Sequence, residues 1–195
     1  MHIVLTIAGF DPSGGAGVLA DSKTVAAFGC FCAAAITSLT SQNSLGVYAT
    51  YHQTPEILRQ QITPVLEDYE IAAVKIGMLP TRELIEVVAT TIGQYSLRNI
   101  VIDPVLSSSS GYLLMEEEAR KLLVEILMPM ATIITPNLDE VEILLGRKPT
   151  SPTEMGAAAR QLSHQVSARN KAPVAVRVAC GKFYGRKNVF VLAIE

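Results

Sequence analysis

Four glycines within nine residues, Gly9 to Gly17, separate a short apolar run from a helical pattern. The run Ile3–Ile7 is typical of a buried strand, and apolar residues recur at helical spacing over Val18–Phe28. A simple turn needs fewer glycines, and glycine permits positive φ and close approach of another molecule to the backbone. The segment is therefore either a tight strand-to-helix connection or part of a ligand site, because α/β sheets bind ligands at the carboxyl ends of their strands.

Strand and helix patterns alternate along the remaining chain. Further strands are predicted at Phe31–Leu39, Ile71–Ile76, Asn99–Ile102, Ala131–Thr135, Pro173–Val178 and Asn188–Ala193. Helices are predicted at Thr54–Leu66, Thr81–Ile92, Glu116–Leu127, Leu138–Leu145 (capped by Gly146) and Ser151–Leu162, and a surface loop at Ser167–Lys171. This alternation, with continuous apolar strands, favours a mainly parallel sheet covered on both faces, within one domain over residues 1–195.

Composition narrows the class of protein. The chain is 49% hydrophobic and 17% charged, which allows a substantial core and argues against disorder. A net charge of −2 without a basic block gives no indication of nucleic-acid or membrane-surface binding, and no apolar run reaches the length of a membrane span. The odd count of three cysteines predicts a reduced, cytoplasmic protein without a disulfide framework or a zinc site.

Polar groups follow five of the predicted strands. In chain order they are Asp11, Gln42 with Asn43, Gly77-Met78, Asp103, and Asn137 with Glu140. Each has a structural alternative: Asp103 could open an Asx turn, and Asn137 could simply cap the next helix. Because the carboxyl ends of parallel strands share one edge of the sheet, the set together predicts a small-molecule site there.

Five segments resemble one enzyme family. They are Ala8–Gly17 with Ala20-Asp21, Thr40–Asn43, Lys75–Leu79, Asp103–Val105 and Ile134–Glu140. In this order and spacing they resemble the hydroxymethylpyrimidine/phosphomethylpyrimidine kinases of thiamine biosynthesis, from Ile3 to about His164. The resemblance implies a ribokinase-like three-layer α/β/α fold with a mainly parallel central sheet, shortened at its C-terminal end.

The resemblance also implies an activity. The family transfers the γ-phosphoryl group of ATP to 4-amino-5-hydroxymethyl-2-methylpyrimidine and then to the monophosphate, with Mg²⁺. The substrate-binding residues would be Asp11, Gly14, Gln42, Met78 and Val105. Gln42 suits the aminopyrimidine edge, because one carboxamide can accept from the exocyclic amine and donate to a ring nitrogen. Met78 and Val105 would form apolar walls, although Met78 could equally belong to the core.

The phosphate side of the site is implied by the pattern Asn-x-x-Glu. Asn137, Glu140 and Asp103 would bind the nucleotide phosphates and Mg²⁺, with Asp103 and Glu140 holding the metal directly or through water. The run Ser107–Gly111 follows Asp103 where the family commonly has a lysine. Its hydroxyls could contact phosphate oxygens, or the run could be a flexible polar loop.

The resemblance fails after residue 165. The family's Gly-Thr-Gly-Cys motif, whose amides form an anion hole and whose cysteine is assigned the base role, is absent. Cys180 does not occupy that position, so the catalytic residue is unknown. Gly181–Lys187 resembles a P-loop only superficially, and a basic hairpin turn is the better interpretation.

The sequence therefore predicts a hydroxymethylpyrimidine (phosphate) kinase that uses ATP and Mg²⁺. A pyridoxal-kinase-like enzyme is one alternative, and a catalytically inactive pyrimidine-binding protein is another. The sequence is either a fragment or tail-damaged copy of a kinase, or a complete chain that binds without transferring phosphate. A homodimer is what the family suggests.

Overall fold

The structure, a computed structural model, describes residues 1–107, 114–170, 173–180 and 189–193. Its strands are β1 (Ile3–Phe10), β2 (Phe31–Asn43), β3 (Gly46–His52), β4 (Ile71–Ile76), β5 (Ile100–Ile102), β6 (Ile133–Ile134), β7 (Ala175–Cys180) and β8 (Val189–Ala193). Its helices are α1 (Gly17–Ala27), α2 (Pro55–Asp68), α3 (Arg82–Gln94), α4 (Glu117–Leu122), α5 (Leu138–Leu145) and α6 (Pro152–Asn170). None of the helices in these ranges is long and apolar enough to cross a membrane.

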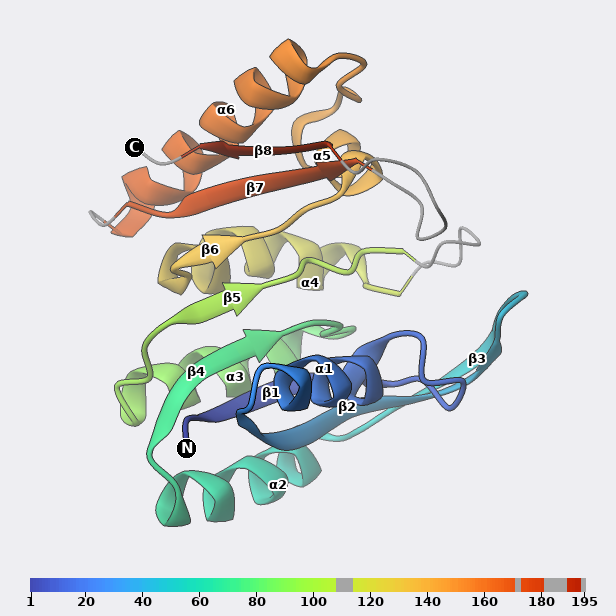
Figure 1. The fold of residues 1–195 in the computed structure, drawn as a ribbon, viewed down its shortest axis with the longest axis vertical. Coiled ribbons are helices and arrows are strands. Elements are labelled where there is room, and N and C mark those ends of the chain that lie inside the picture. The colour runs from blue at the N-terminus through green and yellow to red at the C-terminus, as the bar shows by residue number, and fades with distance from the viewer. Residues whose placement is uncertain (108–113, 171–172, 181–188, 194–195) are drawn as a thin grey trace.

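The described strands form one sheet in the order β3-β2-β1-β4-β5-β6-β7-β8. Pairing is parallel from β2 to β7, whereas β3 and β8 join the edges antiparallel. Helix α1 covers β1 and β2 on one face, and α2, α3 and α4 lie behind the sheet (Figure 1). The predicted α/β fold, with a mainly parallel sheet and helices on both faces, is confirmed.

One row of apolar side chains crosses the sheet on the face that α2 and α3 cover. Adjacent strands place these residues side by side, and each is at most 1% exposed: Ala35, Ile7, Ile76, Ile102, Ile134 and Val176. One position earlier along each strand, the opposite face carries Thr6 beside Lys75. The strands alternate between an apolar core face and a face that carries polar groups near α1.

Two local predictions were wrong and a third is refined. The second strand does not end at Leu39 but continues to Asn43 and pairs with the unpredicted β3, so Gln42 and Asn43 lie within a hairpin and not after a strand. Ser167–Asn170 belongs to α6 and not to a loop, because the helix continues through buried Val166 with polar residues on its exposed side. The helix predicted over Glu116–Leu127 is confirmed over Glu117–Leu127: it is α-helical to Leu122 and widens into a π-turn over Leu123–Leu127.

Two segments that were interpreted from the sequence lie wholly or partly outside the described residues. These are the end of the serine run, from residue 108, and the predicted hairpin turn from residue 181. The strands that flank that turn, β7 and β8, pair antiparallel.

Candidate active site at the carboxyl ends of the strands

Asp11 holds the loop between β1 and α1 together. Its side chain is 4% exposed and accepts hydrogen bonds from the N–H and Oγ of Ser13 at 2.8 and 2.7 Å. It also accepts from the N–H groups of Gly15 and Ala16, at 3.1 and 2.9 Å. Ala16 is the N-cap of α1 and has no side-chain cap, so Asp11 satisfies the Ala16 N–H, which the helix end would leave unpaired. The carboxylate thus shapes the loop, and its oxygens are engaged within it.

Two glycines of this loop are required by backbone geometry. Gly14 and Gly17 have φ of +73° and +59°, where side chains cost energy. A Cβ at Gly17 would lie 2.1 Å from the Gly9 carbonyl oxygen, and Gly17 forms an isolated bridge with Phe10. The carbonyl of Gly14 accepts from Lys23 Nζ at 2.9 Å. The loop is therefore a tight connection whose path only glycine allows at these positions.

The β2–β3 hairpin brings Gln42 to this loop. Gln42 is half-buried, and its Oε1 lies 3.0 Å from the Thr40 hydroxyl, which also lies 2.9 Å from the Phe10 carbonyl oxygen. Asn43 makes different contacts: its Oδ1 accepts hydrogen bonds from the Leu45 N–H and the Tyr48 hydroxyl within the hairpin. Of the amide pair predicted from the sequence, Gln42 is therefore linked to the glycine loop through Thr40, and Asn43 stabilises the turn.

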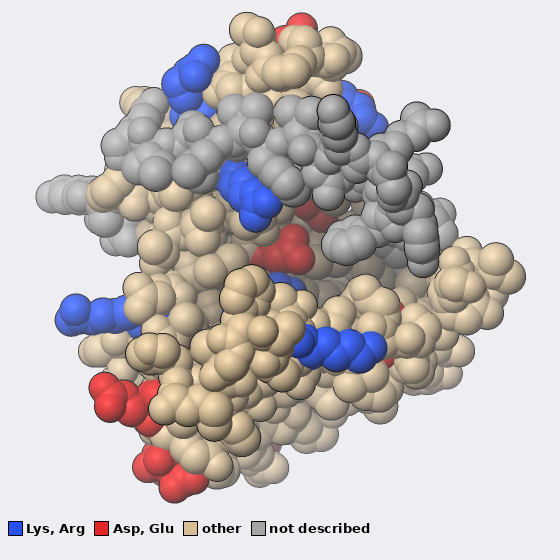
Figure 2. Space-filling view, in the orientation of Figure 1, with Lys and Arg blue, Asp and Glu red and all other residues tan. Residues whose placement is uncertain are grey.

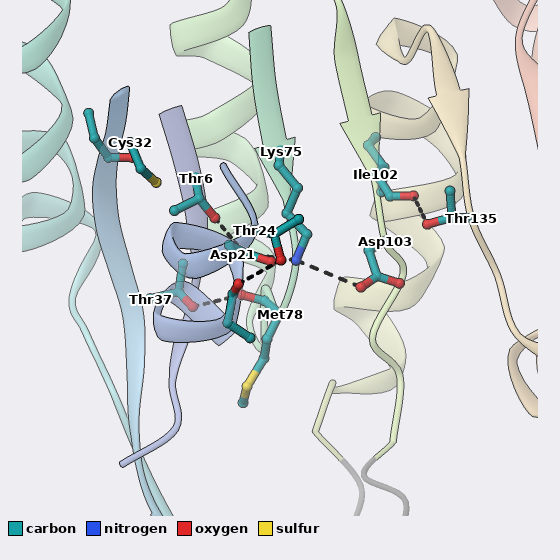
Figure 3. A network of polar contacts seen from close by, with 12 residues as sticks. Thr6, Asp21, Thr24, Cys32, Thr37, Lys75, Met78, Ile102, Asp103 and Thr135 are labelled. Carbon is teal, nitrogen blue, oxygen red and sulfur yellow. Dashed lines mark hydrogen bonds and ion pairs between the residues drawn. The ribbon is translucent and has the colours of Figure 1, made fainter. Parts of the chain in front are cut away.

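Met78 lies against the same loop. It is 6% exposed, and a Cβ on Gly9 would come within 3.1 Å of its sulfur atom. Its carbonyl accepts from the buried Thr37 hydroxyl at 2.7 Å (Figure 3). The structure therefore places Asp11, Gln42 and Met78 around one loop.

A charged network that the sequence did not predict lies on the α1 face of the sheet (Figure 3). Lys75 Nζ of β4 lies 3.0 Å from Asp21 Oδ2 of α1 and 3.7 Å from Asp103 Oδ2 after β5. Asp21 also accepts from the buried Thr6 hydroxyl at 2.6 Å. The signal in the sequence was a lysine within an otherwise apolar strand. The network connects the helix after the glycine loop to the carboxylate of the neighbouring strand end.

Asp103 and Glu140 form the acidic part of the edge. Acidic side chains are recessed near the middle of the face shown in Figure 2. Loss of hydration raises the pKa of Asp103, against the lowering effect of Lys75. Burial raises the pKa of Glu140 to about 8, and the negative charge of Asp103 adds to this rise. Burial disfavours the ionised form of both acidic groups, and a bound cation would favour it.

Asn137 and Glu140 also form a complete capping box at the start of α5. Asn137 Oδ1 accepts from the N–H groups of Asp139 and Glu140, and Glu140 Oε2 accepts from the Asn137 N–H at 2.7 Å. The capping role that was open for Asn137 is therefore confirmed. Glu140 is 3% exposed, and its carboxylate also receives the N–H of Leu106, three residues after Asp103.

The carboxylate oxygens of Asp103 and Glu140 are of the type that Mg²⁺ prefers. Among the described residues, no group of three or more His, Cys, Asp or Glu side chains is arranged as a metal cage. Mg²⁺ accepts carboxylate oxygen and keeps several of its waters, so one or two carboxylates can suffice. Val105, the remaining predicted residue, is half-buried and donates its N–H to the Asp103 carbonyl at 2.8 Å.

A hollow of about 430 Å³ lies elsewhere, at the amino ends of β4 and β5. Its lining includes Tyr69, Tyr95 and Arg98, none of which the sequence predicted as functional. The predicted site residues lie at the carboxyl ends of the parallel strands, so this hollow lies at the opposite edge of the sheet.

Comparison with known proteins identifies the family. A family profile described as phosphomethylpyrimidine kinase matches residues 11–176. The hydroxymethylpyrimidine/phosphomethylpyrimidine kinase of Bacillus subtilis is 44% identical over 162 residues, which are 83% of this chain and 60% of that protein. The protein of the same name from Escherichia coli is 42% identical over 141 residues, 72% of this chain and 53% of that protein. The chain thus aligns with little more than half the length of these relatives.

Solved structures agree with this assignment. A crystal structure of phosphomethylpyrimidine kinase from Clostridium difficile superposes with a TM-score of 0.83 at 35% identity, covering 100% of this chain and 84% of that chain. An ADP complex of Bacillus subtilis pyridoxal kinase gives a TM-score of 0.81 at 34% identity, covering 100% of this chain and 71% of that chain. The expected ribokinase-like fold is confirmed, and the chain belongs to the phosphomethylpyrimidine kinase family.

Proposed function

We propose that this chain transfers the γ-phosphoryl group of ATP to 4-amino-5-hydroxymethyl-2-methylpyrimidine and then to its monophosphate. The observation that carries the proposal is the contact of Gln42 Oε1 with the Thr40 hydroxyl, which itself lies against the Phe10 carbonyl oxygen of the glycine loop. A carboxamide there can accept from the exocyclic amine and donate to the adjacent ring nitrogen. Asp11 and Gly14 would shape the floor of this pocket through the main chain, and Met78 and Val105 would provide apolar walls.

The phosphates would bind toward Asp103, Asn137 and Glu140. Asp103 and Glu140 would hold Mg²⁺ directly or through water, and the ion would supply positive charge to the nucleotide phosphates. In the reaction, the hydroxymethyl oxygen forms a bond to the γ-phosphorus while the bond to the β–γ bridging oxygen breaks. The hydroxyl proton passes to a general base, a role to which we assign no residue.

Two measurements test the proposal. The first is calorimetric binding of the aminopyrimidine to the wild-type chain and to Gln42→Ala, with Ser41→Ala as a control on the exposed side of the same strand. We expect Gln42→Ala to lose at least tenfold in affinity, because a polar edge of the ligand loses its partner. The second is mass-spectrometric detection of the phosphorylated pyrimidine with ATP and Mg²⁺. Failure of the wild-type chain to bind the aminopyrimidine would overturn the proposal.

A pyridoxal-kinase-like activity is the first alternative. The fold similarity to Bacillus subtilis pyridoxal kinase supports it. Competition decides between the two, because pyridoxal should not displace the aminopyrimidine from a site read by Gln42.

An inactive pyrimidine-binding protein is the second alternative. The 195 residues of this sequence do not include the family's Gly-Thr-Gly-Cys motif, whose amides would form the anion hole. Binding of the aminopyrimidine without any ATP-dependent phosphorylation would establish this alternative for the present chain.

The proposed enzyme is a cytoplasmic homodimer. Leu45, Tyr48 and Tyr51 of the β2–β3 hairpin are 83%, 62% and 62% exposed, and β3 is an edge strand. An apolar edge of this kind favours pairing with another chain, and we assign a second copy as the partner. The free thiols of Cys30 and Cys32 suit a reducing compartment. Light scattering should give a dimer mass for the wild type and a monomer mass for Leu45→Ser, and a wild-type monomer would contradict the proposal.

A further inference from the structure

Thr40 is the side chain that contacts both Gln42 and the glycine loop. Its Oγ1 lies 2.9 Å from the Phe10 carbonyl oxygen and 3.0 Å from the Gln42 carboxamide. Thr40 and Gln42 are two positions apart in β2, so they share one face of the strand. A shift in register between Ser41 and Gln42 leaves Tyr48 of β3 unpaired at this point. Bulges of this kind redirect side chains, and this one lies beside Gln42.

The hydroxyl can hold the carboxamide in a single orientation. A threonine hydroxyl has one proton and can accept as well as donate. Its proton lies between two acceptors, the Phe10 carbonyl oxygen and Gln42 Oε1, and donation to Oε1 holds the oxygen end of the carboxamide toward Thr40. This contact restricts rotation about the last side-chain bond and leaves the amide nitrogen on the other side.

We propose that Thr40 is a positioning residue that orients the Gln42 carboxamide and thereby sets the discrimination between an amino group and an oxygen on the pyrimidine ring. The inference rests on the proposed role of Gln42 as the residue that reads the substrate. An anchored carboxamide presents a fixed pair of one acceptor and one donor, which matches an exocyclic amine beside a ring nitrogen. A freely rotating carboxamide can exchange its two ends and also accommodate an exocyclic oxygen beside a ring N–H.

Substitutions of Thr40 distinguish an effect on the orientation of the Gln42 carboxamide from a general loss of structural support for the site. Thr40→Val removes the hydroxyl with little change in shape, and Thr40→Ser keeps the hydroxyl. The assay measures the dissociation constants of the 4-amino ligand and of its 4-oxo analogue. Their ratio is the preference for the 4-amino ligand. We expect Thr40→Val to lower this preference roughly tenfold, the equivalent of one neutral hydrogen bond, and Thr40→Ser and Ser41→Ala to retain it. A purely structural defect would weaken both ligands equally and leave the preference unchanged, which would overturn the proposal.

A second measurement does not depend on the substrate. The side-chain amide signal of Gln42, identified by its absence in Gln42→Ala, reports the order of the carboxamide by NMR relaxation. The order parameter should fall in Thr40→Val and recover in Thr40→Ser. An unchanged order parameter would refute the positioning role even if the pyrimidine binds. Failure of the wild-type chain to bind the pyrimidine, with the amide still ordered by Thr40, would overturn the proposed substrate alone.

Discussion

Replacement of Gly17 by alanine should disrupt the glycine loop by two separable effects. Its φ of +59° costs an L-residue about 1–2 kcal/mol. The new Cβ would also lie 2.1 Å from the carbonyl oxygen of Gly9, so the backbone must move. Displacement of this backbone would break the bridge between Phe10 and Gly17 and strain the hydrogen bonds that Asp11 accepts. We expect a total loss of roughly 3–5 kcal/mol in the free energy of unfolding, at the upper end for single substitutions.

Two other glycines provide matched controls. Gly29 has φ of +71°, but an added Cβ would meet no neighbouring atom within 4 Å, so Gly29→Ala isolates the conformational cost of about 1–2 kcal/mol. Gly93 lies in α3 with the same open surroundings, so Gly93→Ala should stabilise the protein by about 0.5–1 kcal/mol. Urea unfolding of the three variants gives the comparison. A loss in Gly17→Ala no larger than in Gly29→Ala would refute the assignment of the additional cost to the Gly9 contact.

Two further predictions concern the charged groups. Burial raises the pKa of Glu140 from 4.5 to about 8, so between these pH values the folded state keeps a proton that the unfolded state releases. The contribution of this proton to stability is complete below pH 4.5 and is lost as the pH rises through about 8. Glu140→Gln should therefore gain stability relative to wild type as the pH rises from 4.5 to about 8, by on the order of a few kcal/mol, and a constant difference in unfolding free energy would contradict this. Lys75→Met removes the cation beside Asp21 and Asp103 and should cost about 2 kcal/mol of unfolding free energy at pH 7 and less at pH 4. The control Arg82→Met breaks an exposed pair and should have a much smaller effect. Equal losses in thermal unfolding for the two variants would argue against the network.

Elements with local signals were predicted closely. The helix Leu138–Leu145 has the predicted bounds, because Asn137 caps its first turn and Gly146, at φ of +76°, ends it. The glycine loop was also located correctly, since Gly14 and Gly17 have positive φ and a Cβ on Gly17 would collide with the Gly9 backbone. Such signals act over a few residues and do not depend on tertiary contacts.

Elements that depend on distant partners were missed. Strand β3 was not predicted, and it forms by pairing with β2 at the edge of the sheet. Gln42 was selected as a candidate but assigned to the wrong local structure, because its strand extends past the predicted end at Leu39. The contacts of Thr40 and Lys75 depend on segments distant in the chain: Phe10 is 30 residues from Thr40, and Lys75 meets α1 and the end of β5.

The sequence by itself determined the alternation of strands and helices, the position of the glycine loop and the resemblance to one kinase family. These properties arise from periodicity, steric limits and motif order, all of which are local or linear. Only the tertiary structure decided what each side chain does. It engages the Asp11 carboxylate inside the loop, turns Asn43 into the hairpin and leaves Gln42 beside the loop. The physical reason is that hydrogen-bond partners and burial are set by which segments pack together, and several of these lie far apart in the chain.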